Sequence, residues 1–336
     1  MTKRWEDLNA RARGLSTHLL GHAALLDLAA QPDMRALAAA LASEGFQVGA
    51  GASTPEALEL AVRRSGAERL RVLARWCGRR ASVLAVIFED EDRRSLRAML
   101  RGAVQHAPAE ARLAGLLPTP QLPERALGEL AAQPTPARVA ALLAAWHNPY
   151  APSLVPVAGA AEPDLLDLEL AINRTFAARA TSAARGTQLL RGFVAESIDV
   201  ENAVTALVLA GRTTDLVPRE TFLPGGARVS IVDFERAVER GNAADAGIML
   251  AAAFAATGLA RVFERAGADL ATVETAALEA RINALKHVVR VQPLGPAPVL
   301  LYALRLRAET MDLQRIIWSV ALGAGTDRVP PQLASA

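Results

Sequence analysis

Apolar residues recur along the chain with the three- and four-residue spacing of amphipathic helices, whereas sustained alternation of apolar and polar residues is almost absent. Because Ala is the best helix former, short alanine-rich stretches predict helices at residues 34–41, 138–145 and 246–254. Proline and glycine predict loops at residues 118–120, 148–152, 224–226 and 295–298. The pattern therefore predicts an all-α protein.

One short signature recurs three times at a constant spacing. Residues 58–62 read Leu-Glu-Leu-Ala-Val, residues 168–172 read Leu-Glu-Leu-Ala-Ile, and residues 278–282 read Leu-Glu-Ala-Arg-Ile. Both spacings are 110 residues, which is the size of a small domain rather than of a solenoid repeat.

A second anchor follows each signature, at residues 92–102, 199–207 and 311–317. Aligning Leu96, Ala203 and Leu313 gives spacings of 107 and 110 residues, so one small insertion or deletion in a loop accounts for the difference. We expect each anchor to begin or continue a long helix. The sequence thus predicts three tandem helical repeats, at residues 1–112, 113–220 and 221–336.

Composition sets the broad class of protein. Apolar residues make up 51% of the 336 residues, which is enough for a large core. No apolar run approaches the ~18 residues of a bilayer span, and no apolar segment typical of a signal peptide follows the first residues. We therefore expect an intracellular protein without a membrane span. Cys77 is the only cysteine, so we expect no disulfide within the chain and a buried apolar role for this residue.

The charge balance gives no indication of nucleic-acid binding. The formal net charge is only +2, and Lys3 and Lys286 are the only lysines, so Arg carries nearly all the positive charge. A nucleic-acid-binding protein would show basic residues clustered on one face. We expect no nucleic-acid partner.

Several common catalytic and binding motifs are incomplete. A helix would place His18 and His22 on one face, but Leu19 stands where a helical zinc hydrolase needs Glu. Residues 49–54 lack the third glycine and the preceding strand of a dinucleotide loop. The chain has no Gly-Lys-Ser/Thr phosphate loop. We expect no catalytic residue, no cofactor and no metal.

The acidic run at residues 89–92 has three possible roles. Arg93, Arg94 and Arg97 follow it, an order that complements a helix dipole if the acids lie near the N-terminus of a helix. A partner-binding role is an equal alternative. The run could also hold Mg²⁺-diphosphate, as in helical prenyl-transfer enzymes, but residues Asp199 and Glu201 form a poor second motif, so we disfavour an enzyme.

The anchors resemble the C subunit of the A-type and V-type rotary ATPases, whose eukaryotic V-ATPase equivalent is known as the d subunit. Residues 7–14 resemble the family's opening Leu-Asn-Ala-Arg-x-Arg-Gly segment, and residues 92–102 resemble its Asp-x-x-Asn-Leu-Arg-x-x-Leu-Arg pattern, with Ser95 in place of Asn. Residues 199–202 are similar to the Asp-x-x-Asn part of the same pattern. Residues 222–226 are similar to the family's Phe-x-x-Gly-Gly turn, and residues 300–316 to its closing helix. The resemblance covers nearly the whole chain.

The resemblance implies a funnel of three helical domains around a pseudo-threefold axis. In that family the funnel stands on the proteolipid rotor ring and receives the end of the central shaft, which the D and F subunits form. This chain would then be a non-catalytic socket, present in one copy per complex and peripheral on the cytoplasmic face of the membrane. The alternative is a helical repeat scaffold or adaptor unrelated to rotary ATPases, binding a helix in a groove.

Polar residues of the anchor helices are the candidates for the partner interface. A structural role for each, on a solvated face or at a helix end, is an equal alternative. The candidates are Arg94, Arg97, Arg101, Glu201, Asn202, Asp312 and Arg315.

Overall fold

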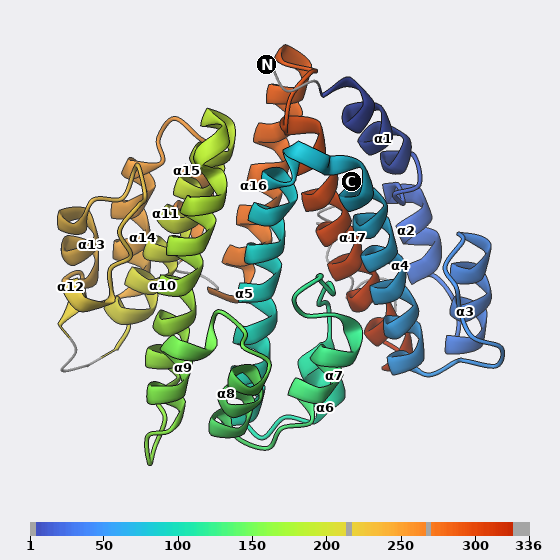
Figure 1. Cartoon of the computed structure of the whole chain (residues 1–336), viewed down its shortest axis with the longest axis horizontal. Helices are drawn as coiled ribbons and strands as arrows, with labels where there is room; N and C mark the ends of the chain where they lie inside the picture. The colour runs from blue at the N-terminus through green and yellow to red at the C-terminus, as the bar shows by residue number, and fades with distance from the viewer. Residues whose placement is uncertain (1–4, 213–216, 267–269, 325–336) are drawn as a thin grey trace. The chain divides into compact units, whose positions relative to one another are not determined.

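The protein is almost entirely helical. The computed structural model describes residues 5–212, 217–266 and 270–324, shown in Figure 1. These residues form seventeen α-helices and two short 3₁₀ helices, and no strand occurs among them. The prediction of an all-α protein is confirmed. In the same residues, no helix combines the length and the apolar character that crossing a bilayer requires.

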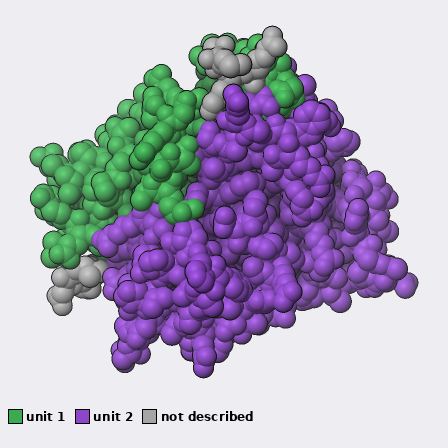
Figure 2. Space-filling view, in the orientation of Figure 1, with its two compact units in different colours: residues 1–9, 176–301 green, residues 10–175, 302–336 purple. Residues whose placement is uncertain are grey.

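The chain divides into two compact units, coloured separately in Figure 2. Unit 1 contains residues 1–9 and 176–301, and unit 2 contains residues 10–175 and 302–336. Three helices pass from one unit into the other, namely α1 (Glu6–Ser16), α10 (Leu165–Ala183) and α17 (Ala297–Ala321). The division into three repeats stays a prediction.

Unit 2 contains two long helices and several short ones. The long helices are α4 (Pro55–Cys77) and α5 (Ser82–Val104), separated by a 3₁₀ turn at Gly78–Arg80. Cys77 is buried at the end of α4. The short helices are α2 (His22–Ala29), α3 (Met34–Ser43), α6 (Ala109–Leu113), α7 (Glu124–Ala131), α8 (Pro136–Ala145) and α9 (Ala151–Ala158).

Unit 1 has the same kinds of helix. The long ones are α11 (Gln188–Ala210) and α16 (Leu270–Val291), and a second 3₁₀ turn at Ala184–Gly186 precedes α11. The short helices are α12 (Pro218–Thr221), α13 (Ile231–Val238), α14 (Ala243–Ala253) and α15 (Leu259–Arg265).

A pair of short helices occurs three times, as α2–α3, α7–α8 and α13–α14. In each pair the second helix starts with a side-chain N-cap, which accepts a hydrogen bond from the backbone three residues ahead and so satisfies a free N–H group of the first turn. The three caps stand at the same distance after the first residue of the preceding helix; they are Asp33, Thr135 and Asn242.

Each helix pair is followed by two long helices, α4–α5, α10–α11 and α16–α17. The Leu-Glu signatures lie in the first long helix of each set and the second anchors in the second, so the expectation that the anchors lie in long helices is confirmed. This recurring order supports the proposal of three repeats, whereas their arrangement in a funnel stays a prediction.

The second long helix of a set packs on the next helix pair along the chain. Helix α5 contacts α7 and α8 within unit 2, and α11 contacts α13 and α14 within unit 1. Helix α17, which has no later pair, packs on the first one. There Leu313, Ile316 and Ile317 share a buried core with Leu25 and Leu37 of α2 and α3.

One expectation about local structure is wrong. The acidic run 89–92 does not lie at a helix N-terminus, because Ser82 and the apolar residues 83–88 already belong to α5. Its charges therefore do not act on the helix dipole, whose influence is confined to the first and last turns. His18 and His22 do not share a helix, because α1 ends at Ser16 and α2 begins at His22.

Candidate functional site

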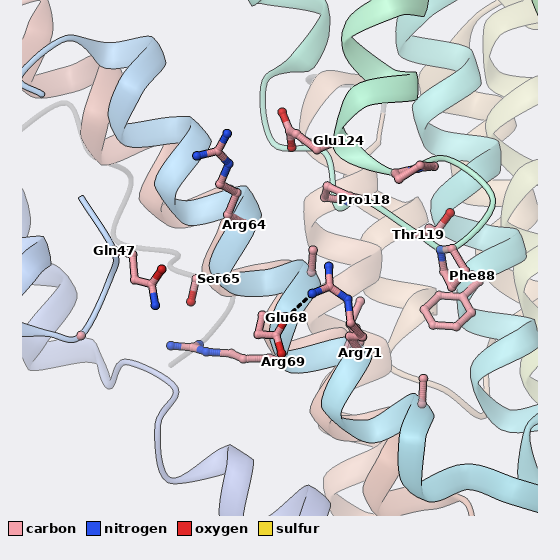
Figure 3. A pocket seen from close by; sticks show the side chains of 16 residues that line it. Gln47, Arg64, Ser65, Glu68, Arg69, Arg71, Phe88, Pro118, Thr119 and Glu124 are labelled. Atoms are coloured by element: carbon pink, nitrogen blue, oxygen red, sulfur yellow. Dashed lines mark hydrogen bonds and ion pairs between the residues drawn. The ribbon is translucent and has the colours of Figure 1, made fainter. Parts of the chain in front are cut away.

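A cavity of about 750 Å³ lies in unit 2 (Figure 3). One face of α4 forms much of its wall, and Phe88 of α5 and the loop before α7 complete it. Residues just after α3 contribute as well. The lining residues are Gly45, Gln47, Arg64, Ser65, Ala67, Glu68, Arg69, Leu70, Arg71, Ala74, Phe88, Pro118, Thr119, Pro120, Pro123 and Glu124.

The sequence of α4 explains how its residues reach this position. Thr54 caps the helix by accepting a hydrogen bond from the N–H of Ala57, and Pro55 stands at a position where its missing N–H costs nothing. Gly66 allows the loop before α7 to approach closely, since a Cβ atom there would lie 2.5 Å from Cδ2 of Leu117.

Most charged groups around the cavity are paired. Arg71 binds Glu68 through a hydrogen bond, drawn in Figure 3. Glu124 accepts from Arg63, with 3.1 Å between Oε1 and Nη2. Arg64 is exposed. The lining thus carries guanidinium, carboxylate and hydroxyl groups. In the described part of the chain, no group of three or more His, Cys, Asp or Glu able to hold a metal occurs.

Arg69 connects this cavity to a buried carboxylate. Its Nη1 atom lies 2.7 Å from Oε2 of Glu309 on α17, which is only 2% exposed. The other oxygen, Oε1, accepts a 2.7 Å hydrogen bond from the N–H of Leu20. Burial raises the pKa of Glu309 above its ordinary value, and Arg69 and the Leu20 N–H oppose that rise. The guanidinium of Arg69 also lies over the ring of Phe46, 5.5 Å from its centroid.

The same kind of bond occurs at the entry to the second helix pair. Asp92 of α5 accepts a 2.5 Å hydrogen bond from the hydroxyl of Thr119. That hydroxyl accepts in turn from the N–H of Leu122 at 2.9 Å. Leu122 stands two residues before α7, as Leu20 stands two residues before α2.

Asp199 of α11 holds the entry to the third pair most extensively. Its carboxylate accepts hydrogen bonds of 3.0 to 3.1 Å from the N–H groups of Ala227, Arg228 and Val229. Val229 stands two residues before α13. Gly226 is required here, since a Cβ atom would lie 2.1 Å from Oδ1 of Asp199.

These three carboxylates occupy the same place in the aligned anchors. Asp92, Asp199 and Glu309 each stand four residues before the aligned Leu96, Ala203 and Leu313. Sequence reasoning missed Glu309 and its partner Arg69, although this alignment contained a signal for Glu309.

The Leu-Glu signature is also explained by contacts of this kind. In α4, Glu59 accepts a 2.8 Å hydrogen bond from Nε1 of Trp318 on α17. In α10, Glu169 accepts from Nη2 of Arg101 on α5 at 3.1 Å. Trp318 and Arg101 are aligned positions, and the aligned residue of α11 is Val208, which has no side-chain donor.

The seven predicted interface residues make contacts inside the protein. Arg97 and Arg101 converge on Glu169, where Nη2 of Arg97 lies 3.4 Å from Oε2. Arg94 reaches Sδ of Met311 at 3.7 Å, and Glu201 is 7% exposed.

The remaining predicted positions lie on α11 and α17. Asn202 exchanges two hydrogen bonds with the backbone of Leu223. Asp312 is fully buried and lies 3.5 Å from Nη1 of Arg315. The side chains of Arg101 and Arg315 keep 43% and 32% of their surface exposed, so these two are best placed to meet a partner.

The acidic run 89–92 is held by internal partners. Arg307 of α17 binds both Asp90, at 2.7 Å, and Glu91, at 2.5 Å, and all three side chains are buried. Although burial alone would lower it, these carboxylates raise the pKa of Arg307. The hydroxyl of Tyr150 donates to Glu89 at 3.1 Å, and burial raises the pKa of that hydroxyl.

Comparison with known proteins identifies the family. A comparison with curated protein sequences gives no significant match. The family model described as "ATP synthase (C/AC39) subunit" matches residues 8–330, which is nearly the whole chain and includes all three carboxylates and the cavity. The chain therefore belongs to the ATP synthase C/AC39 subunit family.

Proposed function

We propose that this protein is the non-catalytic central-stalk component of a rotary V/A-type ATPase. In this role it is a socket that couples the shaft, formed by the D and F subunits, to the proteolipid ring during ion transport or ATP synthesis. One copy sits on the cytoplasmic face of the membrane in each complex. Membership in the C/AC39 family supports a place in such a complex.

The order of the contacts is the observation that carries the proposal. Helix α5 is bonded to the entry of the second helix pair, α11 to the entry of the third, and α17 to the entry of the first. The series of bonds is therefore cyclic, in contrast to an open stack of repeats, in which terminal units have one neighbour. A cyclic series favours three repeats enclosing a central space.

The dense internal pairing of charges fits transmission of force rather than catalysis. Ion pairs such as Arg307–Asp90 and Arg69–Glu309 tie helices that are far apart in sequence. Close-packed interiors have low compressibility and transmit strain. A torque coupler needs this property and needs no reactive group.

Co-purification of the full-length tagged chain from its own membranes, followed by mass spectrometry, tests the proposal. We expect the D and F subunits of the shaft and the proteolipid to be recovered at a constant ratio to the chain. Recovery of the chain alone from intact solubilised complexes would instead favour the adaptor alternative.

A second measurement separates coupling from assembly. Vesicles that contain the complete complex should couple ATP hydrolysis to ion movement, and complexes depleted of this chain should lose ion movement. Hydrolysis by the catalytic head should persist, because the proposed role is mechanical. Equal loss of both activities would contradict a purely coupling role.

A further inference from the structure

Both ends of the first helix pair are held through a single ion pair. Its N-terminal end is held at Leu20, which donates to Glu309. Its C-terminal end is held at Phe46, whose ring contacts the guanidinium of Arg69. Because Arg69 and Glu309 bind each other at 2.7 Å, one ion pair holds both ends of the segment. We name residues 20–47 the strap and the Arg69–Glu309 pair the clasp.

The strap is part of the wall of the cavity. Gly45 and Gln47, at its C-terminal end, line the cavity together with Arg69. Figure 3 shows Arg69 directed to the side of α4 where Gln47 lies, whereas the guanidinium of Arg71 is directed toward Glu68. Movement of the strap would therefore change the width of the cavity on one side only.

The residues that lead into the strap donate fewer backbone hydrogen bonds to their carboxylate than the residues that lead into the third helix pair. Glu309 receives one backbone N–H from the strap, whereas Asp199 receives three from the residues before α13. The helices of the strap contain eight and ten residues, so they depend on the packing of their buried leucines against α4 and α17. A supersecondary unit of this kind can open with a lower free energy than global unfolding, and in the strap that free energy then comes from the clasp and from the buried leucines.

We propose that the strap opens as a unit when the clasp releases, and that this opening widens the cavity between Gln47 and Arg69. The apolar face of α17, with Leu313, Ile316 and Ile317, supplies the restoring force, because these residues lose their buried partners when the strap opens. The inference concerns the chain alone and does not depend on the proposed coupling role.

Hydrogen exchange of the full-length protein, followed by mass spectrometry, tests this proposal. In Arg69→Met, which removes both contacts of the guanidinium, we expect the amides of residues 20–47 to exchange about tenfold faster or more. The amides of Leu122 and Val229 should keep their wild-type rates. Arg69→Lys keeps the charge and should restore part of the protection.

Arg71→Met is the matched control, because Arg71 lies on the same helix and lines the same cavity but pairs with exposed Glu68. It should leave exchange in the strap unchanged. If Arg69→Met does not fold, Glu309→Gln provides the same test with a side chain of equal size. Uniform acceleration across the chain, or no acceleration in the strap, would overturn the proposal.

Discussion

Leu20 and Glu309 are separated by 289 positions in the sequence and joined by a 2.7 Å hydrogen bond from the backbone N–H to Oε1. The corresponding bonds of Asp92 and Asp199 connect residues that are only 27 to 30 positions apart. A carboxylate on a long helix thus accepts hydrogen bonds in all three cases. Two of these connections are local, and one joins the first and last parts of the chain. The bonds differ in partner, which allows each to be tested separately.

The close approach of Gly226 to Asp199 predicts a specific cost for a larger residue. In Gly226→Ala, the new Cβ atom would lie 2.1 Å from Oδ1 of Asp199, so the carboxylate must leave its backbone partners. We expect the free energy of unfolding to fall by about 1–3 kcal/mol, as overpacked sites do. Gly192→Ala, on α11 together with Asp199, is the control, because nothing lies within 4 Å of a Cβ atom there. It should raise stability by roughly 0.5–1 kcal/mol, and urea unfolding measures both.

The aligned residues Asn202 and Ser95 predict opposite effects of the same substitution. Asn202→Ala leaves the buried N–H and C=O of Leu223 without their partner, which should cost about 2 kcal/mol of unfolding free energy. The hydroxyl of Ser95 is buried without a hydrogen-bond partner among the described residues, so Ser95→Ala should be neutral or stabilising. Both free energies are measured by urea unfolding. Equal losses of unfolding free energy in the two variants would show that the bonds to Leu223 do not cause the loss in Asn202→Ala.

Burial of Glu59 predicts a pH dependence of stability. Burial is the largest cause that raises its pKa above 4.5, nearby Glu56 adds to the rise, and Trp318 and Arg63 oppose it. Because the folded pKa is the higher one, the protonated form stabilises the protein fully below about pH 4.5. That contribution is lost as pH rises through the folded pKa. Glu59→Gln stays neutral and keeps an acceptor for Trp318, so its stability relative to wild type should increase between pH 4.5 and pH 8. Parallel curves for the two proteins would contradict this.

The buried triad of Arg307, Asp90 and Glu91 predicts a large loss when its cation is removed. Arg307→Met leaves two buried carboxylates without their shared partner, which should lower the free energy of unfolding by about 3–5 kcal/mol. Adding Glu91→Gln should recover part of the loss, because one uncompensated charge is then removed. Arg219→Met, which breaks an exposed pair with Glu235, should leave the free energy of unfolding nearly unchanged.

Exposure of Arg315 predicts an effect on assembly. Its side chain is 32% exposed, and its contact with Asp312 is long, at 3.5 Å between Nη1 and Oδ1. We therefore expect Arg315→Ala to reduce co-purification of the other ATPase subunits more than it reduces thermal stability. Arg97 is unsuitable for this test, because its buried side chain contacts Glu169 and a reversed charge there would disturb folding. Unchanged assembly with a lower melting temperature would assign Arg315 a structural role.

Much of the helical order could be predicted because it depends on local pattern. The alanine-rich stretches and both anchors lie in helices, as periodicity predicts, and the predicted breaks at residues 118–120 and 224–226 lie in loops. The predicted breaks at residues 148–152 and 295–298 are only partly right, because α9 begins at Ala151 and α17 at Ala297. The helix-dipole interpretation of residues 89–92 failed because an amphipathic pattern continues upstream to Ser82, so the true start of α5 has no charged marker.

The contacts of the candidate site were harder to predict because they join distant segments. Nothing near Arg69 in the sequence identifies Glu309 as its partner, and nothing near Leu20 identifies its acceptor. The position of Glu309 could be obtained from the anchors, but its longer side chain hid its equivalence to Asp92 and Asp199. Equivalent positions in the repeats can thus be aligned from the sequence more easily than their contact partners can be identified.

The single cysteine has a practical consequence for measuring motion. Cys77 is 2% exposed, so it should react slowly with thiol reagents in the folded protein. One introduced cysteine, for example at Leu322, which is 76% exposed, would carry a fluorophore or a bead at a known place without removing the native thiol. Rotation of a single assembled complex, or its absence, could then be followed by light microscopy through this chain itself.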